Sequence, residues 1–165
     1  MPARAALISV STSRSAGAAA DESREPLERF AAGLGLEVHA FELIPDEQER
    51  IEELLRRYSD AEACELILTS GGTGVAPSDV TPEATLAVIE RHVPGIGEAL
   101  REASRAHTPN WMLSRAQAGI RGGSLIVNFP GSPASIEQAG AAIAPALGHA
   151  LALIAGRPSE HHPQG

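Results

Sequence analysis

The sequence predicts an α/β protein with a three-layer αβα sandwich around a mostly parallel central sheet. Its 165 residues fit one hydrophobic core, so we expect a single domain over residues 1–156. Short apolar segments alternate with amphipathic ones along most of the chain, and parallel strands need helical crossovers between them. A glycine-rich loop follows one apolar segment, as ligand-binding loops follow the carboxyl ends of strands in open α/β sheets.

Five segments of the first half alternate between strand and helix patterns. Residues 5–11 form a short apolar run that leads into a Ser/Ala/Gly-rich stretch, which predicts a buried strand. Residues 26–34 repeat apolar side chains every three or four positions and end near two glycines, so they predict a helix. Residues 36–44 alternate as a strand does, residues 46–58 have one apolar face as an amphipathic helix does, and residues 66–69 predict a third, buried strand.

The second half begins with two predicted helices. Residues 81–91 carry apolar side chains at helical spacing and predict a helix with Thr81 as its N-cap. Pro82 suits the first turn, where a backbone N–H would have no partner within the helix. Residues 95–106 predict the next helix.

The last part of the chain predicts two strands and a helix. The strands are residues 112–117 and 124–128, on either side of a turn over residues 118–123. The final helix begins after Ser132-Pro133 and ends near residue 153. Residues 157–165 are polar and contain proline, so we expect a frayed tail whose His161-His162 pair is disordered rather than metal-binding.

The composition argues against several classes of binding partner. The net charge of -8 argues against nucleic acid, because binding its backbone needs clustered cations. All 13 basic residues are Arg, which excludes a phosphate-binding lysine of the Walker type. No segment approaches the ~20 apolar residues that span a bilayer, and the N-terminus lacks a signal pattern, so we expect a cytoplasmic protein with no membrane partner.

The loop Ser70-Gly71-Gly72-Thr73-Gly74 is the first candidate binding element. Its three glycines can adopt positive φ and let a ligand come into contact with backbone amides. Such a loop can bind a phosphate or a planar heterocycle, although a tight strand-to-helix connection is the alternative. We expect Ser11, at the end of the first strand, to lie at the same edge of the sheet.

Two aspartates, Asp46 and Asp79, are the candidate metal ligands. Aspartate is scarce in this chain, with 4 residues against 17 glutamates, and both of these lie at predicted loop ends. Carboxylates near strand ends suit Mg²⁺, which prefers oxygen ligands and often bridges substrate phosphates, so the pattern favours nucleotidyl or phosphoryl transfer. Structural roles are the alternatives. Asp46 can be an N-cap, because Glu49 nearly completes a capping box, and Asp79 can form an Asx-turn.

The segment from Asn128 to Pro133 ends the last predicted strand and begins the last predicted helix. Its backbone amides and Ser132 could therefore bind an anion at the helix N-terminus. A simple helix start is the alternative. Ser114 and Arg115 lie in a segment that we expect to be exposed near strand ends.

Several sequence blocks resemble the MogA/MoaB family of molybdenum cofactor biosynthesis proteins, to which the G domain of gephyrin is related. The blocks occur in the family's order between residues 5 and 155. They are Ile44-Pro45-Asp46-Glu47, Leu68-Thr69-Ser70-Gly71-Gly72-Thr73-Gly74, Asp79-Val80-Thr81-Pro82-Glu83-Ala84-Thr85, Met112-Leu113-Ser114-Arg115, Gly119-Ile120-Arg121-Gly122 and Asn128-Phe129-Pro130-Gly131-Ser132.

The resemblance implies a molybdopterin adenylyltransferase, which moves AMP from Mg-ATP to the terminal phosphate of molybdopterin and releases pyrophosphate. It implies that Asp46 and Asp79 are the catalytic acidic positions that bind Mg²⁺ and position the ATP phosphates. It also implies nucleotide contacts by residues 70–74 and Ser11, and a homo-oligomer, either a trimer or a dimer of trimers. The positions that it implies near molybdopterin are Ser104, Ser114, Arg115, Asn128, Pro130, Gly131 and Ser132.

Three positions depart from the usual pattern of the family. Thr12 stands where a first strand ending in Val-Ser-Asp has its Asp, Arg24 stands in the Gly position of Asp-x-Ser-Gly, and Ser78 stands where Arg commonly precedes Asp79. These changes keep a second hypothesis open, a molybdopterin-binding paralogue with little or no transferase activity. A third, a molybdate-inserting domain of the MoeA type, requires additional domains that 165 residues do not accommodate.

Overall fold

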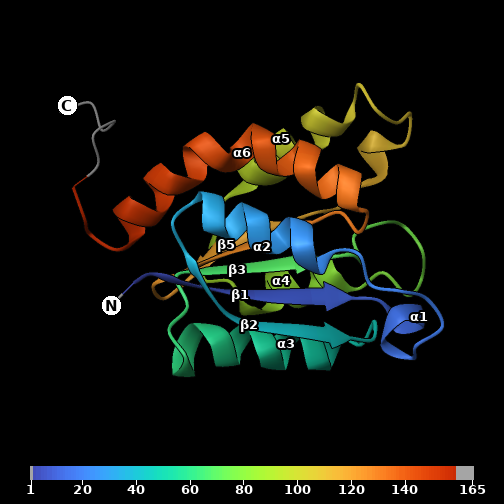
Figure 1. Ribbon diagram of the computed structural model, residues 1–165, viewed down its shortest axis with the longest axis horizontal. Helices are drawn as coiled ribbons and strands as arrows, with labels where there is room; N and C mark the ends of the chain where they lie inside the picture. Colours follow the sequence, from blue (N-terminus) through green and yellow to red (C-terminus); the bar gives the residue numbers. More distant parts are fainter. Residues whose placement is uncertain (1, 159–165) are drawn as a thin grey trace.

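The computed structural model describes residues 2–158, in which helices cover both faces of a six-stranded sheet (Figure 1). This confirms the predicted three-layer αβα sandwich. The strands are β1 Arg4–Val10, β2 Glu37–Ile44, β3 Leu66–Ser70, β4 Arg91–His92, β5 Ala118–Arg121 and β6 Ser124–Phe129. The helices are α1 Thr12–Ser15, α2 Arg24–Gly33, α3 Gln48–Arg56, α4 Thr81–Val88, α5 Pro94–Ser104 and α6 Pro133–Ile154, with a π-helical turn η1 Arg57–Ala61 and a 3-10 turn η2 Trp111–Leu113. The predicted His161-His162 pair lies outside the described residues.

The sheet has the strand order β2-β1-β3-β6-β5-β4. β1, β2, β3 and β6 pair in parallel, while β5 and β4 are attached by antiparallel pairs. The mostly parallel sheet is therefore confirmed. Because parallel strands end at a common edge, the segments that follow Val10, Ile44, Ser70 and Phe129 all begin there.

The sheet divides the apolar core into two halves. α2, α5 and α6 cover one face, and α3 and α4 cover the other (Figure 1). Along β1, Ala5 and Leu7 face the first group of helices, whereas Ala6 and Ile8 face the second. This strand is buried on both sides, which explains why its sequence is continuously apolar. Within residues 2–158 no helix has the length and apolar character that crossing a bilayer requires.

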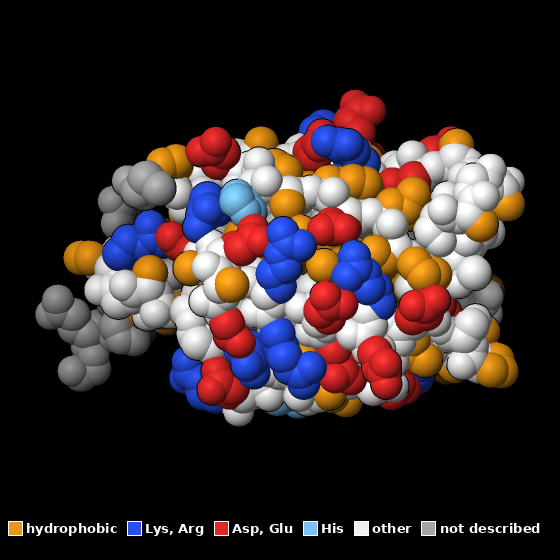
Figure 2. Space-filling view, turned by 90° about the horizontal axis from the view of Figure 1, so that it is seen from below, with side chains coloured by type: hydrophobic (Ala, Val, Ile, Leu, Met, Phe, Trp, Pro, Cys, Tyr) orange, Lys and Arg blue, Asp and Glu red, His pale blue; other side chains and the backbone are white. Residues whose placement is uncertain are grey.

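Charged side chains of both signs cover the face on which α3 lies (Figure 2). On this helix Arg50 pairs with Glu53 at 3.0 Å, and Arg56 pairs with Glu52 at 3.1 Å. Exposed helical pairs of this kind contribute about 0.5 kcal/mol or less each. Over this face acidic and basic groups alternate, so it lacks the continuous basic surface that binds a nucleic-acid backbone.

The structure corrects the prediction for residues 112–123. Residues 112–117 contain η2 and an irregular segment instead of a strand, and the predicted turn 118–123 contains strand β5. The two apolar side chains at the start of this segment, Met112 and Leu113, are exposed, with Met112 62% accessible. β5 was missed because of Gly119, which is required by packing: a Cβ there would lie 2.6 Å from the Ile89 side chain.

Three structural alternatives for polar residues at helix starts are wrong. Glu47, and not Asp46, precedes α3 as its N-cap, and Val80, and not Thr81, precedes α4. An Asx-turn at Asp79 would need the N–H of Thr81, which instead donates to the carbonyl oxygen of Gly72 at 3.1 Å. All three side chains are engaged elsewhere: Asp46 with Thr12, Thr81 with Gly71 and Asp79 with Ala76.

Candidate active site

The candidate site lies at the carboxyl edge of the sheet, to which the arrowheads of β1, β2 and β3 point in Figure 1. Backbone hydrogen bonds join the ends of neighbouring strands at this edge. Ser11 N–H donates to the carbonyl oxygen of Ile44 at 2.9 Å, and Gly71 N–H donates to that of Phe129 at 3.1 Å. The starting points of the loops that follow β1, β2, β3 and β6 are therefore fixed by the sheet.

The glycine loop is packed so tightly between these strand ends that side chains are excluded from it. Gly71 and Gly72 have φ values of +90° and +69°. A Cβ at Gly71 would overlap the carbonyl oxygen of Val10, and one at Gly72 would overlap Thr81 Oγ1. The Thr81 hydroxyl donates to the carbonyl oxygen of Gly71 at 3.0 Å. Both glycines are thus required by conformation and by space.

The two predicted carboxylates both border this loop. Asp46 Oδ1 lies 3.1 Å from where a Cβ of Gly72 would be, and Asp79 Oδ2 lies 2.8 Å from where a Cβ of Gly74 would be. Asp79 Oδ2 also accepts a hydrogen bond from the N–H of Ala76 at 3.0 Å, which closes the loop. The structure therefore brings together the glycine loop and both aspartates that the sequence singled out.

Arg115, which the resemblance places near molybdopterin, binds the glycine loop. Its Nε donates to the carbonyl oxygen of Gly74 at 2.7 Å and its Nη2 to that of Asp79 at 2.9 Å. Its own N–H donates to the carbonyl oxygen of Thr73 at 2.8 Å. Nη1 pairs with the carboxylate of Glu83 on α4. One side chain thereby fixes both ends of residues 74–79 against α4.

The hydrogen bond from Arg115 lowers the pKa of Glu83 below its ordinary value. The contribution of this ion pair to stability is complete above the unfolded pKa of about 4.3 and is lost as the pH falls through the lower folded value. We expect Glu83→Gln to cost at most about 1 kcal/mol at pH 7, because the side chain is 43% exposed, and we expect this cost to shrink as the pH falls through the lowered folded pKa of Glu83.

Urea unfolding of both forms from about pH 7 to about pH 3 measures this difference. Glu98→Gln is the matched control, because within residues 2–158 this exposed carboxylate forms no ion pair or hydrogen bond. A gap between Glu83→Gln and wild type that is independent of pH would contradict the assigned role of the ion pair.

Three of the residues predicted to contact molybdopterin have their polar groups engaged within the fold. Asn128 is completely buried in β6; its Nδ2 donates to Thr69 and Thr85 at 3.0 and 2.9 Å. The hydroxyl of Ser104 donates to the carbonyl oxygen of Leu100 on its own helix, at 3.3 Å. Ser114 Oγ accepts a weak hydrogen bond of 3.4 Å from the N–H of Ala116.

The last loop, residues 130–132, lies directly beside the glycine loop. A Cβ on Gly131 would lie 3.5 Å from the Cα of Gly71. Ser132 is the N-cap of α6, and its Oγ accepts from the N–H of Ser135 at 3.2 Å. The helix-start interpretation of Ser132 is thus confirmed, and it leaves the N-terminus of a 22-residue helix at this edge of the sheet.

A polar cluster beneath the first loop was missed at the level of sequence. Asp21 Oδ1 accepts hydrogen bonds from the hydroxyls of Ser9 at 3.1 Å and Ser23 at 2.8 Å. Arg14 approaches the same oxygen at 3.6 Å and donates to the carbonyl oxygen of Gly131 at 3.4 Å. It therefore connects the first loop to the last one. The scarcity of aspartate and the Asp-x-Ser pattern of Asp21 and Ser23 were the signals that could have drawn attention to this cluster.

One hydroxyl at the site is left unused by the described part of the fold. Ser70 Oγ, at the start of the glycine loop, is buried and has no hydrogen-bond partner within residues 2–158. Ser70 pairs with Ser9 of β1 in the sheet, beside the polar cluster. An unpaired buried hydroxyl costs free energy, so such groups occur where water or a ligand binds.

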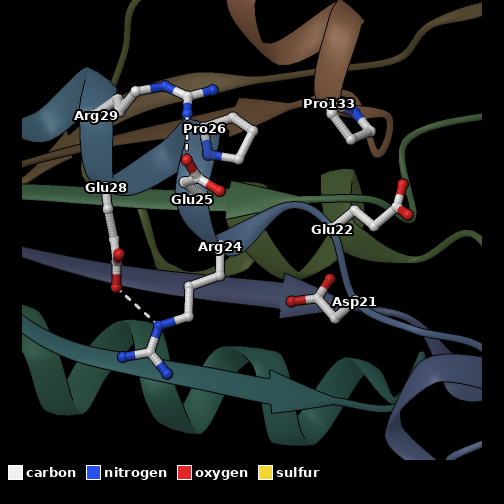
Figure 3. A pocket seen from close by; sticks show the side chains of 8 residues that line it. All are labelled: Asp21, Glu22, Arg24, Glu25, Pro26, Glu28, Arg29 and Pro133. Atoms are coloured by element: carbon white, nitrogen blue, oxygen red, sulfur yellow. Dashed lines mark hydrogen bonds and ion pairs between the residues drawn. The ribbon is translucent and has the colours of Figure 1, made fainter.

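A pocket lined by residues of α2 and its preceding segment and by Pro133 lies beside this site, and no residue of the glycine loop lines it (Figure 3). It measures about 660 Å³ and is bordered by the start of α2 and by Pro133, and no residue predicted to be functional lines it. Four of its eight lining residues are acidic, and its two arginines, Arg24 and Arg29, pair with Glu28 and Glu25. Its charge suits an anionic ligand poorly, so the glycine loop remains the better candidate.

Two carboxylates offer the kind of ligand that Mg²⁺ requires. Within residues 2–158 no three His, Cys, Asp or Glu side chains gather as a metal site. Mg²⁺ usually takes one or two carboxylates and completes its shell with water and substrate phosphates. Asp46 Oδ1 faces the loop and, in the described part of the chain, carries no hydrogen bond, so the donor set fits this ion.

The architecture places this chain among the α/β proteins with an open, mostly parallel sheet, a class in which ligands bind at the carboxyl ends of the strands. Residues 6–149 match the family described as "Probable molybdopterin binding domain". The chain is 43% identical to the molybdopterin adenylyltransferase of Escherichia coli K12 over 137 residues, which are 82% of this chain and 70% of that protein. It is 44% identical to that of Haemophilus influenzae over 134 residues, 80% of this chain and 68% of that protein.

A solved structure agrees with these relatives. The molybdopterin biosynthesis enzyme MoaB from Thermus thermophilus superposes with a TM-score of 0.88 at 43% identity, covering 94% of this chain and 98% of that chain. The protein therefore belongs to the MogA/MoaB family of molybdenum cofactor biosynthesis proteins, and the resemblance stated from the sequence is confirmed.

Proposed function

We propose that this protein transfers AMP from Mg-ATP to the terminal phosphate of molybdopterin and releases pyrophosphate. The observation that carries the proposal is the placement of Asp46 and Asp79 beside one glycine loop, with their oxygens next to Gly72 and Gly74. Relatives that share 43–44% identity over at least 80% of the chain are named molybdopterin adenylyltransferase, which supports the same reaction.

The reaction forms one phosphorus–oxygen bond and breaks another. An oxygen of the pterin phosphate attacks the α-phosphorus of ATP, and the bond from that phosphorus to the bridging oxygen breaks, so that pyrophosphate leaves with its electron pair. Mg²⁺, when bound, supplies the positive charge that two meeting anions require. Asp46 and Asp79 would hold it, because the carboxylates of both border the glycine loop.

The contribution of the chain's own residues is to position the two reacting phosphates. In-line attack requires the two phosphates to meet at a fixed distance and angle, and such alignment contributes much of the rate of a transfer reaction. Arg115 fixes the loop, and Gly131 brings the last loop into contact range of Gly71. We propose that the pterin phosphate binds on the side of this last loop, near the N-terminus of α6.

Incubation of the purified protein with molybdopterin, ATP and Mg²⁺, with pyrophosphate release as the signal, tests the proposal. We expect one pyrophosphate per adenylylated pterin and no release when either the pterin or Mg²⁺ is omitted. Tight binding of molybdopterin without any pyrophosphate release would reject the transferase function.

That result would favour the second candidate, a molybdopterin-binding paralogue. Its support lies in the replaced residues Thr12 and Ser78, which leave the first loop without a usual carboxylate and the glycine loop without a usual arginine. The third departure has a different outcome: Arg24 pairs with Glu28 at 2.7 Å and stacks over the Phe41 ring at 4.8 Å. Its side chain is thus accommodated on the surface of α2 and β2.

A further inference from the structure

We propose that Thr12 is a positioning residue that fixes the carboxylate of Asp46 with one defined oxygen toward the glycine loop. The inference rests on the proposed function. Three hydrogen bonds join the two residues reciprocally. Thr12 N–H and Thr12 Oγ1 donate to Asp46 Oδ2 at 3.0 and 2.9 Å, and Asp46 N–H donates to Thr12 Oγ1 at 3.1 Å.

The pairing decides which oxygen of Asp46 is available. Both donors of Thr12 bind Oδ2, whereas Oδ1 lies beside Gly72 and carries no hydrogen bond among the described residues. A carboxylate that accepts two hydrogen bonds at one oxygen loses rotational freedom about its terminal torsion, which is otherwise broad. Thr12 therefore holds Oδ1 in the direction of the loop before any ligand binds.

The two residues sit on segments that the sheet itself fixes. Thr12 begins α1 just after β1, and Asp46 follows β2 by two residues. Ser11 N–H donates to the carbonyl oxygen of Ile44, so the ends of these strands are joined immediately beside the pair. The joined strand ends fix the backbone positions of Thr12 and Asp46, so neither backbone needs to move for the three bonds to form.

The neutral side chain of Thr12 also avoids a second negative charge next to Asp46. A carboxylate in the place of the Thr12 hydroxyl would lie about 3 Å from Asp46 Oδ2, where two negative charges repel each other. The neutral hydroxyl donates instead. In this chain the orientation of Asp46 is thus set by the protein and is independent of a bound cation.

The test measures the dissociation constant of ATP with Mn²⁺, without pterin, by isothermal titration, together with kcat and KM of the complete reaction. Thr12→Val keeps the side-chain volume and the backbone N–H but removes the hydroxyl, and we expect it to weaken Mn-ATP binding about tenfold. Thr12→Ser restores the hydroxyl and should bind within about twofold of wild type. Ser15→Ala is the matched control, because this hydroxyl of α1 donates to the carbonyl oxygen of Thr12 and does not contact Asp46.

A double-mutant cycle separates positioning from a merely structural role. In an Asp46→Asn background, Thr12→Val should change Mn-ATP affinity by less than about twofold, because the carboxylate that it orients is gone. Equal losses in both backgrounds, or a lower urea midpoint with unchanged affinity in Thr12→Val, would overturn the inference while the transferase function stands. A wild-type protein that neither binds Mn-ATP nor releases pyrophosphate would overturn the proposed function and this inference with it.

Discussion

Replacement of Asp46 or Asp79 by Asn should lower kcat/KM for AMP transfer by at least about a hundredfold, while the free energy of unfolding changes by no more than about 1 kcal/mol. Asn keeps the size of each side chain and one acceptor oxygen, so the bonds from Thr12 and Ala76 can persist. It removes the negative charge beside Gly72 or Gly74. Initial rates of pyrophosphate release and urea unfolding measure the two quantities.

Asp60→Asn is the control for this pair of substitutions. The carboxylate of Asp60 is 54% exposed in η1 and pairs with Arg121 at 2.8 Å, so the same chemical change removes an ion pair that does not involve the glycine loop. We expect its rate to stay within about twofold of wild type. Wild-type turnover in both Asp46→Asn and Asp79→Asn would show that these carboxylates have only structural roles.

Gly71→Ala should destabilise the protein by about 3 kcal/mol or more. The substitution has two costs: a φ of +90° that residues with a Cβ rarely adopt, and an overlap of the new Cβ with the carbonyl oxygen of Val10. The obstacle is backbone at the end of β1, which cannot move without disturbing the sheet. Urea unfolding gives the free energy, and the titration of Mn-ATP reports the loss of the loop's shape.

Gly122→Ala separates the two costs. Gly122 has a φ of +53° in the turn between β5 and β6, but a Cβ there would meet nothing within 4 Å. We therefore expect only the conformational cost, about 1 kcal/mol, with Mn-ATP binding unchanged. If Gly71→Ala costs no more than Gly122→Ala, the close packing of the glycine loop against β1 is not a constraint.

The sequence predicts best those elements whose pattern follows from burial. Residues 5–8 of β1 and 66–68 of β3 are continuously apolar because helices cover both faces of these strands, and α3 shows one apolar stripe because it covers one face. The strand predicted at residues 112–117 is wrong, because this segment has no continuous apolar run and Met112 is exposed. β4, with two residues, is too short to leave any periodic pattern.

The site is predicted where its chemistry is local and missed where it depends on tertiary pairing. The glycine loop and its spacing to Asp79 are visible as a continuous segment. The bonds from Thr12 to Asp46 and from Arg115 to Gly74 join residues 34 and 41 positions apart, and nothing in either segment alone indicates the partner. Asn128 ends the predicted strand 124–128, but nothing in that segment indicates that its side chain donates to Thr69 and Thr85. The predicted homo-oligomer stays a prediction.

The four bonds of Arg115 also affect the free energy with which the glycine loop binds a ligand. Because one guanidinium and one backbone amide already order residues 73–79, the conformational entropy of this loop is lost during folding and not during binding. A ligand that enters a preorganised loop retains more of its contact energy as affinity. The loop is thus already ordered before a ligand binds. We expect the association rate of the ligand to be limited by diffusion and orientation and not by closure of the loop.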